Sequence, residues 1–534
     1  MSMNTGNEAG LWSLVADRAQ ATPQAVAFVW EGSDVTYAEF HELCMRATGW
    51  LQAQDVRPGD RLAVWLVNSL EWLALFFASA RLGAILVPIN TRYRSDEVTH
   101  ILNKSGARML FLQPGFRKID FAEVLAKMDG ADVPALEKVA VKGGGSNPAP
   151  VLGRPTVGFD VSASDLVRTP DESDPDQCCV VFSTSGTTKG PKLVMHNQRV
   201  IVDHIRRCVS AFGFDEPGAV LLHALPFCGV FGLAVGLTGL AAGVPVVLLD
   251  TFDAQLAAQL MRSHDVTHTF GSDEMILRLE QVAPGDNPFP TLRRFGFGAF
   301  GSSFTEEAQR TCQRGIPLFG MYGSSEVMAL FSIQSAQLPL NQRLEGGGVP
   351  VAGKDARVRV RDLESGNLMA PGELGELEIL APSNFMGYYN DPEATAQAVD
   401  AEGYFRTGDI GHLRDDGSFV YKTRKGDAIR LAGFLVNPVE IEEVLKRLDG
   451  VFDAQVVAID IDGTTRVVGF VIPQPGRQCD EATLIEQTRA VVAPFKVPAR
   501  IWFLDEFPVT QSSNGLKTQR NKLRDMAAER LAAA

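Results

Sequence analysis

The feature that most restricts the fold of this chain is a small, polar loop between two apolar runs. Residues 182–197 read FSTSGTTKGPKLVMHN, and two valines precede them. This order predicts a strand, a flexible loop and a second strand in the middle of a domain. Hydroxyl groups, backbone N–H groups freed by glycines and one cation suit a highly charged anion such as a polyphosphate. They come from Thr184, Ser185, Thr187, Thr188, Gly186, Gly190 and Lys192.

Two alternatives compete with an anion-binding loop. A solvated Ser/Thr/Gly linker has the same composition, but this loop lies between strand-like runs. A Walker A loop needs G-x-x-x-x-G-K-[ST] leading into a helix. Here Gly186 and Gly190 are too close together and Pro191 follows them. The order therefore favours an anion-binding loop of another kind.

Strands and helices alternate before the loop. Residues 61–67 and 84–89 are apolar runs, and residues 70–82 between them have helical length. This alternation predicts a parallel sheet covered by helices. Residues 132–176 are rich in Gly, Pro, Ser and Asp without a sustained period, which predicts a peripheral excursion. Residues 346–389 alternate short runs with turns and predict an antiparallel, barrel-like subdomain.

Size and charge restrict the class of protein. A length of 534 residues implies more than one domain. The net charge of -14 opposes nucleic acid or an anionic membrane as the main partner, because both need concentrated positive charge. Seven cysteines without C-x-x-C spacing argue against a disulfide framework or a zinc site and favour a reducing, cytoplasmic location. The N-terminus has no basic segment before an apolar run, so no signal peptide is expected.

One uncharged stretch challenges the interpretation as a soluble protein. Ala224 to Leu249 contains no charged residue and is long enough to cross a bilayer. Five glycines and two prolines interrupt it. They predict a loop, a buried helix and a strand at Val244–Leu249, so we expect no membrane span.

Several motifs, in one order along the chain, carry a resemblance to a known family. Residues 184–192 resemble the T-S-G-T-T-x-x-P-K phosphate loop of the adenylate-forming superfamily, which includes acyl-CoA synthetases. Residues 322–326 (YGSSE) resemble its Y-G-x-T-E motif, and residues 402–409 (EGYFRTGD) resemble G-[YW]-[FR]-x-T-G-D. Residues 423–442 resemble the family's hinge segment, and residues 508–520 its terminal P-x-T-x-x-G-K-x-x-R motif. Each motif alone is weak evidence for the family, whereas the occurrence of all of them in this order is specific to it.

The resemblance implies a fold and a set of ligands. It implies an α/β protein with a large N-terminal AMP-binding domain of layered sheets, residues 1–425, and a small mobile α+β domain, residues 426–534. The hinge is expected at Gly426, because glycine tolerates large changes of backbone angle. ATP, Mg²⁺ and coenzyme A are the expected small-molecule partners. No nucleic acid partner is expected, and a homodimer is left open.

The resemblance also implies roles for individual residues. The expected catalytic residues are Lys517, Glu326 and Thr188, of which Glu326 and Thr188 would hold Mg²⁺. The expected ATP phosphate site is Thr184, Ser185, Gly186, Thr187, Thr188 and Lys192. The expected adenine and ribose site is Gly301, Ser302, Ser303, Tyr322, Gly323, Ser325, Asp409 and Arg424. The expected acyl pocket is Phe227, Gly229, Val230, Phe231, Phe297 and Phe300. The expected CoA tunnel is Arg430, Gly433 and Phe434, and Lys522 is the rival of Lys517.

The implied reaction joins a carboxylic acid to CoA. Carboxylate and ATP would give acyl-adenylate and pyrophosphate, and the CoA thiol would then give acyl-CoA and AMP. Cys228 follows Phe227 where amino-acid adenylation domains usually place Asp, so we expect a fatty, alicyclic or aromatic acid. Gly229 lacks the side chain usual at that corner, which predicts a wider pocket, a different gate or a simple turn. An adenylate-forming enzyme with a non-CoA acceptor and a non-catalytic nucleotide-binding regulator remain alternatives.

Overall fold

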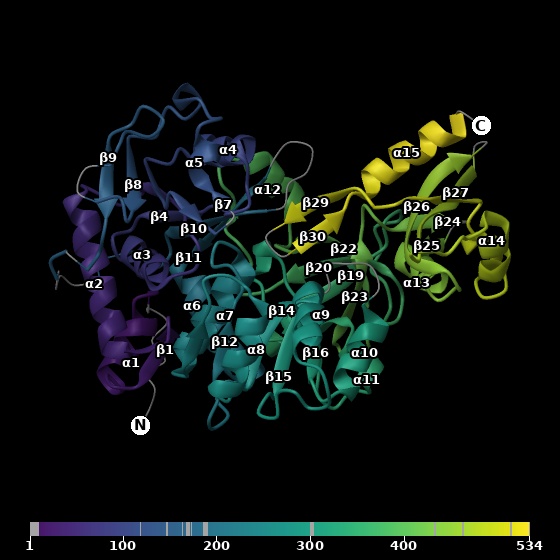
Figure 1. Cartoon of the computed structure of the whole chain (residues 1–534), viewed down its shortest axis with the longest axis horizontal. Coiled ribbons are helices and arrows are strands. Elements are labelled where there is room, and N and C mark those ends of the chain that lie inside the picture. The colour runs from purple at the N-terminus through teal and green to yellow at the C-terminus, as the bar shows by residue number, and fades with distance from the viewer. Residues whose placement is uncertain are drawn as a thin grey trace.

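The structure has a large part and a smaller part at one end of the molecule (Figure 1). The computed structural model describes residues 10–117, 119–145, 148–162, 164–166, 171, 173–184, 191–298, 304–431, 434–461, 464–512 and 515–532. The arrangement confirms the predicted α/β class with a large N-terminal part and a small C-terminal part. The exact boundary at residue 426 stays a prediction.

An eight-stranded sheet carries the predicted phosphate loop. Its order is β21-β11-β10-β4-β3-β5-β8-β9, with parallel pairing from β10 to β9 and antiparallel pairing at β11 and β21. β3 and β4 confirm the predicted parallel pair. The strands are β3 (Arg61–Trp65), β4 (Ile85–Pro88), β5 (Met109–Leu112), β8 (Lys138–Lys142), β9 (Thr156–Phe159), β10 (Cys178–Ser183), β11 (Leu193–Asn197) and β21 (Gly387–Tyr388).

The prediction of a peripheral excursion over residues 132–176 is wrong in part. β8 and β9 lie in this range and extend the sheet from β5 in parallel. β8 reads KVAVK, and only its three central residues are buried. So short a run shows no clear period in the sequence, and the neighbouring strand supplies the pairing that makes it a strand.

Helix α3 (Leu70–Arg81) connects β3 to β4 through the core. All its residues except Glu71 are buried, as expected of a helix that is apolar on every side. Ser69 caps its first turn, because the Ser69 hydroxyl accepts a hydrogen bond from the Trp72 N–H at 3.3 Å.

A thirteen-stranded sheet forms the second layer of the large part. Its order is β19-β20-β22-β23-β18-β17-β16-β15-β14-β12-β13-β1-β2. Pairing is parallel from β16 to β1 and antiparallel elsewhere. In the range predicted as barrel-like, β18, β19 and β20 therefore continue the parallel sheet through β17, whereas β21 joins the eight-stranded sheet. The strands are β1 (Val26–Trp30), β2 (Ser33–Thr36), β12 (Leu221–His223), β13 (Val246–Leu248), β14 (His268–Ser272), β15 (Arg294–Gly298), β16 (Leu318–Tyr322), β17 (Ser332–Ile333), β18 (Gly346–Pro350), β19 (Arg357–Arg361), β20 (Gly375–Leu380), β22 (Phe405–Leu413) and β23 (Phe419–Arg424).

The uncharged stretch folds as predicted into a loop, a helix and a strand. Helix α7 (Val230–Ala242) is buried over residues 230–240, and β13 follows it. Among the described residues, no helix has the length and apolar character needed to cross a membrane. The other helices of the large part are α1 (Ser13–Ala21), α2 (Tyr37–Ala53), α4 (Ser95–Ser105), α5 (Phe121–Leu125), α6 (Gln198–Ala211), α8 (Ala254–Ser263), α9 (Asp273–Val282), α10 (Thr305–Gln313), α11 (Leu340–Arg343) and α12 (Pro392–Ala398).

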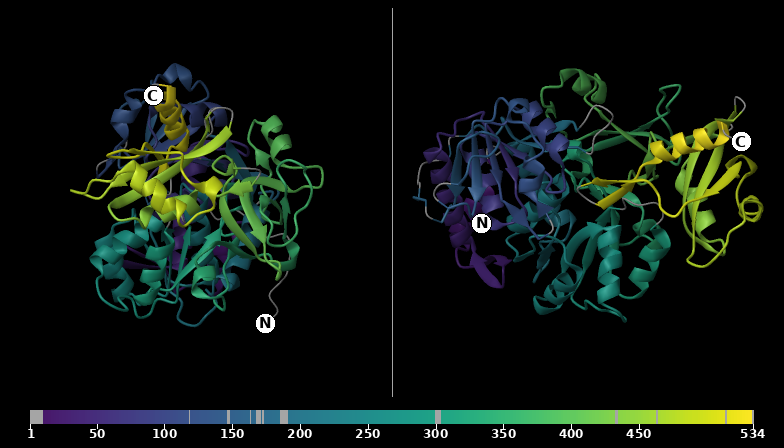
Figure 2. Two further views of the ribbon diagram at one scale, coloured as in Figure 1. Left: turned by 90° about the vertical axis from the view of Figure 1, so that its right-hand side faces the viewer. Right: turned by 45° about the horizontal axis from the view of Figure 1, so that its top comes forward.

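The small part is built on a three-stranded sheet, β26-β27-β28. A hairpin, β29-β30, extends from it toward the large part, whereas helix α15 lies along the outside (Figures 1 and 2). Its elements are β24 (Ile429–Leu431), β25 (Phe434–Val436), α13 (Pro438–Lys446), β26 (Val451–Ile461), β27 (Thr464–Pro473), α14 (Glu481–Arg489), β28 (Arg500–Phe503), β29 (Val509–Ser512), β30 (Gly515–Thr518) and α15 (Arg520–Ala532).

Three features of the small part differ from what the sequence predicts. The sequence predicts one strand at residues 430–434, whereas Arg430 lies in β24 and Phe434 in β25, and these two strands pair antiparallel. The sequence predicts an extended segment at residues 494–503, whereas residues 494–496 form a 3-10 turn. The sequence predicts a tail after the last strand, whereas the chain there forms helix α15, which buries Leu523 and Ala527 against β26 and β27.

Candidate active site

The base of the predicted phosphate loop is closed by two backbone-based hydrogen bonds. The Thr184 N–H donates to the Lys192 carbonyl at 2.9 Å, and the Lys192 N–H donates to the Thr184 hydroxyl at 3.2 Å. β10 and β11 therefore hold the two ends of the loop together. The predicted residues between them, Ser185, Gly186, Thr187 and Thr188, lie outside the described residues.

A connected series of side chains leads from this loop to the YGSSE motif. The Lys192 ammonium lies 4.5 Å from the centre of the Tyr388 ring, within the range of a cation–π contact. The Tyr388 hydroxyl donates to Glu326 Oε1 at 3.0 Å. Burial, and secondly the Glu326 charge, raises the pKa of Tyr388, so the phenol stays protonated and can donate. The predicted phosphate-binding and metal-binding residues are thus linked through one tyrosine.

Tyr388 has no signal in the sequence that singles it out. It lies in the two-residue strand β21, which pairs antiparallel with β11 so that Val194 faces Tyr388. The Phe385 N–H also donates to the Glu326 carbonyl at 2.8 Å. Pairing between Val194 and Tyr388, which are about a third of the chain length apart in sequence, brings Tyr388 to the site, and a pattern confined to neighbouring residues cannot reveal that.

A second cluster joins three of the predicted adenine and ribose residues. The Tyr322 hydroxyl donates to Asp409 Oδ2 at 2.5 Å, and Arg424 Nη1 lies 3.0 Å from Asp409 Oδ1. Asp409 and Arg424 face each other on β22 and β23. The Asp409 carboxylate raises the pKa of Arg424, and burial raises the pKa of Tyr322. The cluster therefore presents a fixed, ion-paired carboxylate in a buried position.

The Tyr322 ring is packed in the core of this region. It contacts Phe331, Phe419 and Tyr421, with ring centres 6.4, 5.3 and 5.8 Å away, and it is 7% exposed. The packed ring therefore fixes the Tyr322 hydroxyl, which holds Asp409 through its hydrogen bond. Gly301, Ser302 and Ser303, which were predicted beside the adenine, lie outside the described residues.

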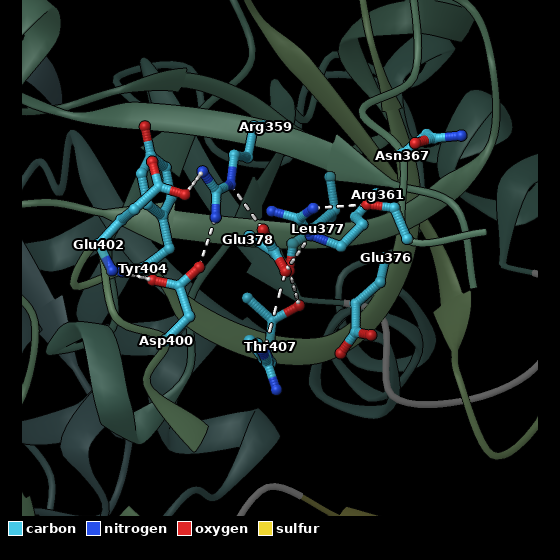
Figure 3. A network of polar contacts seen from close by, with 12 residues as sticks. Arg359, Arg361, Asn367, Glu376, Leu377, Glu378, Asp400, Glu402, Tyr404 and Thr407 are labelled. Carbon is cyan, nitrogen blue, oxygen red and sulfur yellow. Dashed lines mark hydrogen bonds and ion pairs between the residues drawn. The ribbon is translucent and has the colours of Figure 1, made fainter. Parts of the chain in front are cut away.

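An ion network joins β19 and β20 to the segment that leads into β22 (Figure 3). The Arg359 guanidinium lies among Glu378, Asp400 and Glu402, and its carbon is 3.7 Å from the centre of the Tyr404 ring. Glu378 is 1% exposed, and its Oε1 also accepts a hydrogen bond from Arg361 Nε at 2.9 Å. Such a satisfied, buried network resists displacement.

Thr407 connects this network region to the Asp409 backbone. The Thr407 hydroxyl donates to the Leu377 carbonyl at 2.7 Å and accepts the Asp409 N–H at 2.9 Å. Tyr404 and Thr407 both belong to the EGYFRTGD motif. The motif therefore fixes the position of Asp409 as well as supplying it.

A cavity of about 160 Å³ opens at the carboxyl ends of strands from both sheets. Asn68, Arg92, Cys228, Ser272, Met275 and Arg278 are among the residues that line it. Ligands of parallel α/β sheets commonly bind at such an edge. The predicted acyl-pocket residues Phe227, Gly229, Val230, Phe231 and Phe297 do not line this cavity.

Phe227 belongs to the main core of the large part. Its ring is fully buried, stacks on His223 with centres 4.7 Å apart and is tilted against Trp72 at 5.5 Å. Phe297 is also buried, in a different cluster, and Phe300 lies outside the described residues. Gly229 caps the start of α7 with an extended backbone. The predicted apolar pocket therefore stays a prediction.

The predicted catalytic lysine lies on the hairpin that extends toward the large part. Lys517 is in β30, opposite Thr510 in β29, and its side chain lies outside the described structure. Its rival Lys522 is exposed on the outer helix α15. For the predicted CoA tunnel, Arg430 faces Leu435 in the β24-β25 hairpin, Phe434 faces Leu431, and Gly433 is outside the described residues.

Comparison with solved structures defines the class of protein. The structure is similar to ATP-bound MatB from Rhodopseudomonas palustris, with a TM-score of 0.82 and 25% identity over 97% of this chain and 99% of that chain. It is also similar to an o-succinylbenzoate CoA synthetase from Bacillus subtilis bound to an acyl-adenylate, with a TM-score of 0.79 and 23% identity over 97% and 98% of the chains. The two-part α/β fold is therefore that of adenylate-forming enzymes.

Sequence comparison then assigns the family. The AMP-binding enzyme family matches residues 15–389, and the AMP-binding enzyme C-terminal domain matches residues 440–514. This chain belongs to the AMP-binding enzyme family. A fatty acid–[acyl-carrier-protein] ligase of Streptomyces coeruleorubidus is 32% identical over 95% of this chain and 94% of its own length. A medium-chain fatty-acid–CoA ligase of Escherichia coli is 27% identical over 98% and 92%.

Proposed function

We propose that this enzyme is an ATP-dependent carboxylic acid:CoA ligase that works through an acyl-adenylate. In the first step a carboxylate oxygen of the acid attacks the α-phosphorus of ATP, and pyrophosphate leaves. In the second step the CoA thiol attacks the acyl carbon, and AMP leaves. Fatty, alicyclic and aromatic acids are the proposed substrates, and relatives that act on fatty and aromatic acids support this range.

The linked series Lys192, Tyr388 and Glu326 is the observation that carries the proposal. It joins the end of the predicted phosphate loop to a carboxylate through contacts of 4.5 and 3.0 Å. Phosphoryl-transfer sites need fixed cations and metal-binding carboxylates around the reacting phosphates. Here the protein supplies one of each within one connected unit.

The residues present fit Mg²⁺ and a ribose. Tyr388 contacts one oxygen of Glu326, and a carboxylate has about four acceptor positions, so capacity remains for a hard cation. Glu326 and Thr188 are the proposed protein ligands. When bound, Mg²⁺ would neutralise charge on the phosphates. Asp409, which Tyr322 and Arg424 hold in place, is the proposed acceptor for the ribose hydroxyls.

The contacts around Gly426 support a hinge at this residue. On its N-terminal side, the Lys425 N–H donates to the Gly408 carbonyl at 2.8 Å, and the Lys425 ammonium donates to Glu376 at 2.8 Å. On its C-terminal side, Arg524 of helix α15 donates to the Gly426 carbonyl at 2.7 Å. The chain is thus held to the large part just before Gly426 and to the small part just after it. Rotation of the small part would then concentrate on Gly426.

A carrier-protein thiol is the second candidate acceptor. The Streptomyces coeruleorubidus relative, which matches this chain at 32% identity, is a fatty acid–[acyl-carrier-protein] ligase. A carrier protein presents the same thiol group on a phosphopantetheine arm, so the first half-reaction would be unchanged. The two acceptors differ only in the second half-reaction.

A panel assay tests both proposals. Purified enzyme is given ATP, Mg²⁺ and one carboxylic acid at a time, and pyrophosphate release is measured alone, with CoA and with a holo acyl carrier protein. Acid-dependent pyrophosphate with AMP and acyl-CoA as final products supports the first proposal. Acyl transfer that occurs only when the carrier protein is present supports the second proposal, a carrier-protein thiol as acceptor. Nucleotide binding without acid-dependent pyrophosphate for any acid would instead indicate the non-catalytic alternative.

A further inference from the structure

Three consecutive residues beyond Glu326 have a left-handed backbone. Met328, Ala329 and Leu330 have φ angles of 61°, 49° and 39°. None is glycine, and residues with a Cβ rarely adopt this region even singly. Such a run persists only where the surrounding structure holds it. It begins directly after the 3-10 turn Ser325–Val327 that contains Glu326, and all three residues are buried.

Buried side chains from β11 and α6 hold the 3-10 turn and the left-handed run by their carbonyl groups. His196 Nε2 lies 2.7 Å from the Ser325 carbonyl oxygen, and His204 Nε2 lies 2.8 Å from that of Ala329. A carbonyl oxygen can only accept, so each imidazole donates from Nε2–H. Burial lowers the pKa of both histidines to about 4, so both rings are neutral at pH 7.

Cys208 adds a third contact from the same face of α6. Its thiol points at the Leu330 carbonyl, with sulfur and oxygen 3.8 Å apart. Cys208 is four residues after His204, so both side chains project from one side of the helix. A buried imidazole has a desolvation cost that an aliphatic side chain would avoid. The carbonyl groups of Ser325 in the turn and of Ala329 in the run accept the hydrogen bonds that offset this cost.

The YGSSE motif packs directly on the left-handed run. A Cβ on Gly323 would lie 2.8 Å from Ala329 backbone atoms and 2.9 Å from the Leu330 nitrogen, so only glycine fits there. The Ala329 N–H also donates to the Ser324 carbonyl at 2.9 Å. A shift of the run would therefore move the turn that carries Glu326.

We propose that His196 and His204 are positioning residues for Glu326, acting through the carbonyl groups of Ser325 and Ala329. Within the described part of the chain, both imidazoles hydrogen-bond to backbone carbonyl groups and not to the Glu326 carboxylate, so their effect passes through the backbone. The inference rests on the proposed function, in which Glu326 holds Mg²⁺ beside the phosphates. The histidines fix where that carboxylate lies relative to Tyr388 and Lys192.

The test compares two substitutions of His204 with a matched substitution elsewhere. His204→Gln keeps an N–H donor at a similar reach, whereas His204→Leu removes it. His268→Leu is the control, because His268 is also buried, bonded to the Thr267 hydroxyl at 2.7 Å and stacked on Phe214. We expect His204→Leu to lower the rate of acid-dependent pyrophosphate release about tenfold and to raise the half-saturating Mg²⁺ concentration. His204→Gln and His268→Leu should leave the Mg²⁺ dependence unchanged.

A second measurement does not depend on activity. Amide hydrogen exchange in a peptide covering residues 323–333 should speed up in His204→Leu and stay unchanged in His268→Leu. If wild-type enzyme releases no pyrophosphate with any acid, the proposed function fails, and the exchange result still decides whether the histidine holds the run. Unchanged exchange together with unchanged Mg²⁺ dependence in His204→Leu would overturn the inference.

Relief of the backbone strain provides a rescue test. Glycine tolerates a φ of 49° without penalty. In the His204→Leu background, Ala329→Gly should therefore restore much of the lost rate of pyrophosphate release and much of any lost stability of the fold. If His204→Leu alone does not fold, the activity and hydrogen exchange of the double variant are measured in its place. If the double variant folds and has the same low activity and fast exchange as His204→Leu, the strained run does not transmit the effect and the inference fails.

Discussion

Removal of one hydroxyl group, in Tyr388→Phe, should separate the Glu326 carboxylate from its neighbours while keeping the Tyr388 ring. The ring faces the Lys192 ammonium at 4.5 Å, and the hydroxyl donates to Glu326 at 3.0 Å. Phenylalanine keeps the first contact and loses the second. The variant therefore measures how much the Tyr388 hydroxyl contributes to positioning the Glu326 carboxylate.

The magnitude follows from the acceptor and its surroundings. A hydrogen bond to a charged group contributes about 1.5–3 kcal/mol, and about 1.4 kcal/mol corresponds to a tenfold change. Tyr388 is 5% exposed, but Glu326 is only half-buried, so water can partly replace the lost donor. We therefore expect the lower end of the range, a loss of about tenfold in kcat/KM for the first half-reaction.

The assay is acid-dependent pyrophosphate release as a function of Mg²⁺ concentration. The half-saturating Mg²⁺ concentration should rise in Tyr388→Phe, because the proposed metal ligand is less well fixed. Tyr389→Phe is the matched control, since Tyr389 is the adjacent residue and packs on a different cluster. Tyr388→Leu also removes the ring and should lose more activity, by roughly the 0.5–1 kcal/mol of an exposed cation–π contact.

One result would refute the reasoning behind this prediction. If Tyr388→Phe is folded and its kcat/KM and Mg²⁺ dependence stay within twofold of Tyr389→Phe, the hydroxyl does not position Glu326 for catalysis. The link between the phosphate loop and the YGSSE motif would then be structural only.

Three further predictions test other parts of the molecule. Asp409→Asn should weaken ATP binding about tenfold, measured by calorimetry, because the amide replaces one acceptor oxygen with a donor at the proposed ribose site, whereas Asp416→Asn in an exposed turn should not. Gly426→Pro should slow one half-reaction far more than the other in single-turnover assays, because proline fixes φ, while Gly426→Ala should spare adenylation, since a Cβ there meets nothing within 4 Å. Burial lowers the pKa of His204 and His268 to about 4, so the unfolded state binds more protons between about pH 6.5 and pH 4. The free energy of unfolding should therefore fall as pH drops through this window, by up to about 1.4 kcal/mol per pH unit for each histidine, and His268→Leu should reduce the slope in urea titrations.

The sequence predicts the parts of the site that local signals define. The strands on either side of the predicted phosphate loop, the parallel strands before it and the loop, helix and strand of residues 224–249 are all confirmed. In each case an apolar run meets a cluster of small or turn-forming residues, so the element and its end are readable from neighbouring residues.

Other features depend on contacts between distant segments. Tyr388 reaches the site through a two-residue strand that pairs with β11, and the histidine contacts to residues 325 and 329 join segments more than 120 residues apart. The strands β8 and β9 have too few residues to show a period and depend on β5 for pairing. Nothing in the local pattern distinguishes His196 or His204 from an ordinary core histidine.

The contacts in this structure do not by themselves explain why residue 426 is a glycine. A Cβ at this position would meet nothing within 4 Å, and its φ lies outside the left-handed region, so packing here does not require glycine. The residues on both sides are nevertheless fixed: Lys425 to Glu376 of the large part, and the Gly426 carbonyl to Arg524 of the small part. A glycine that its own surroundings do not need, placed between two fixed points, is explained if the chain visits a second arrangement with different backbone angles at that residue. The contacts on both sides of Gly426 therefore support the proposed rotation of the small part between the half-reactions.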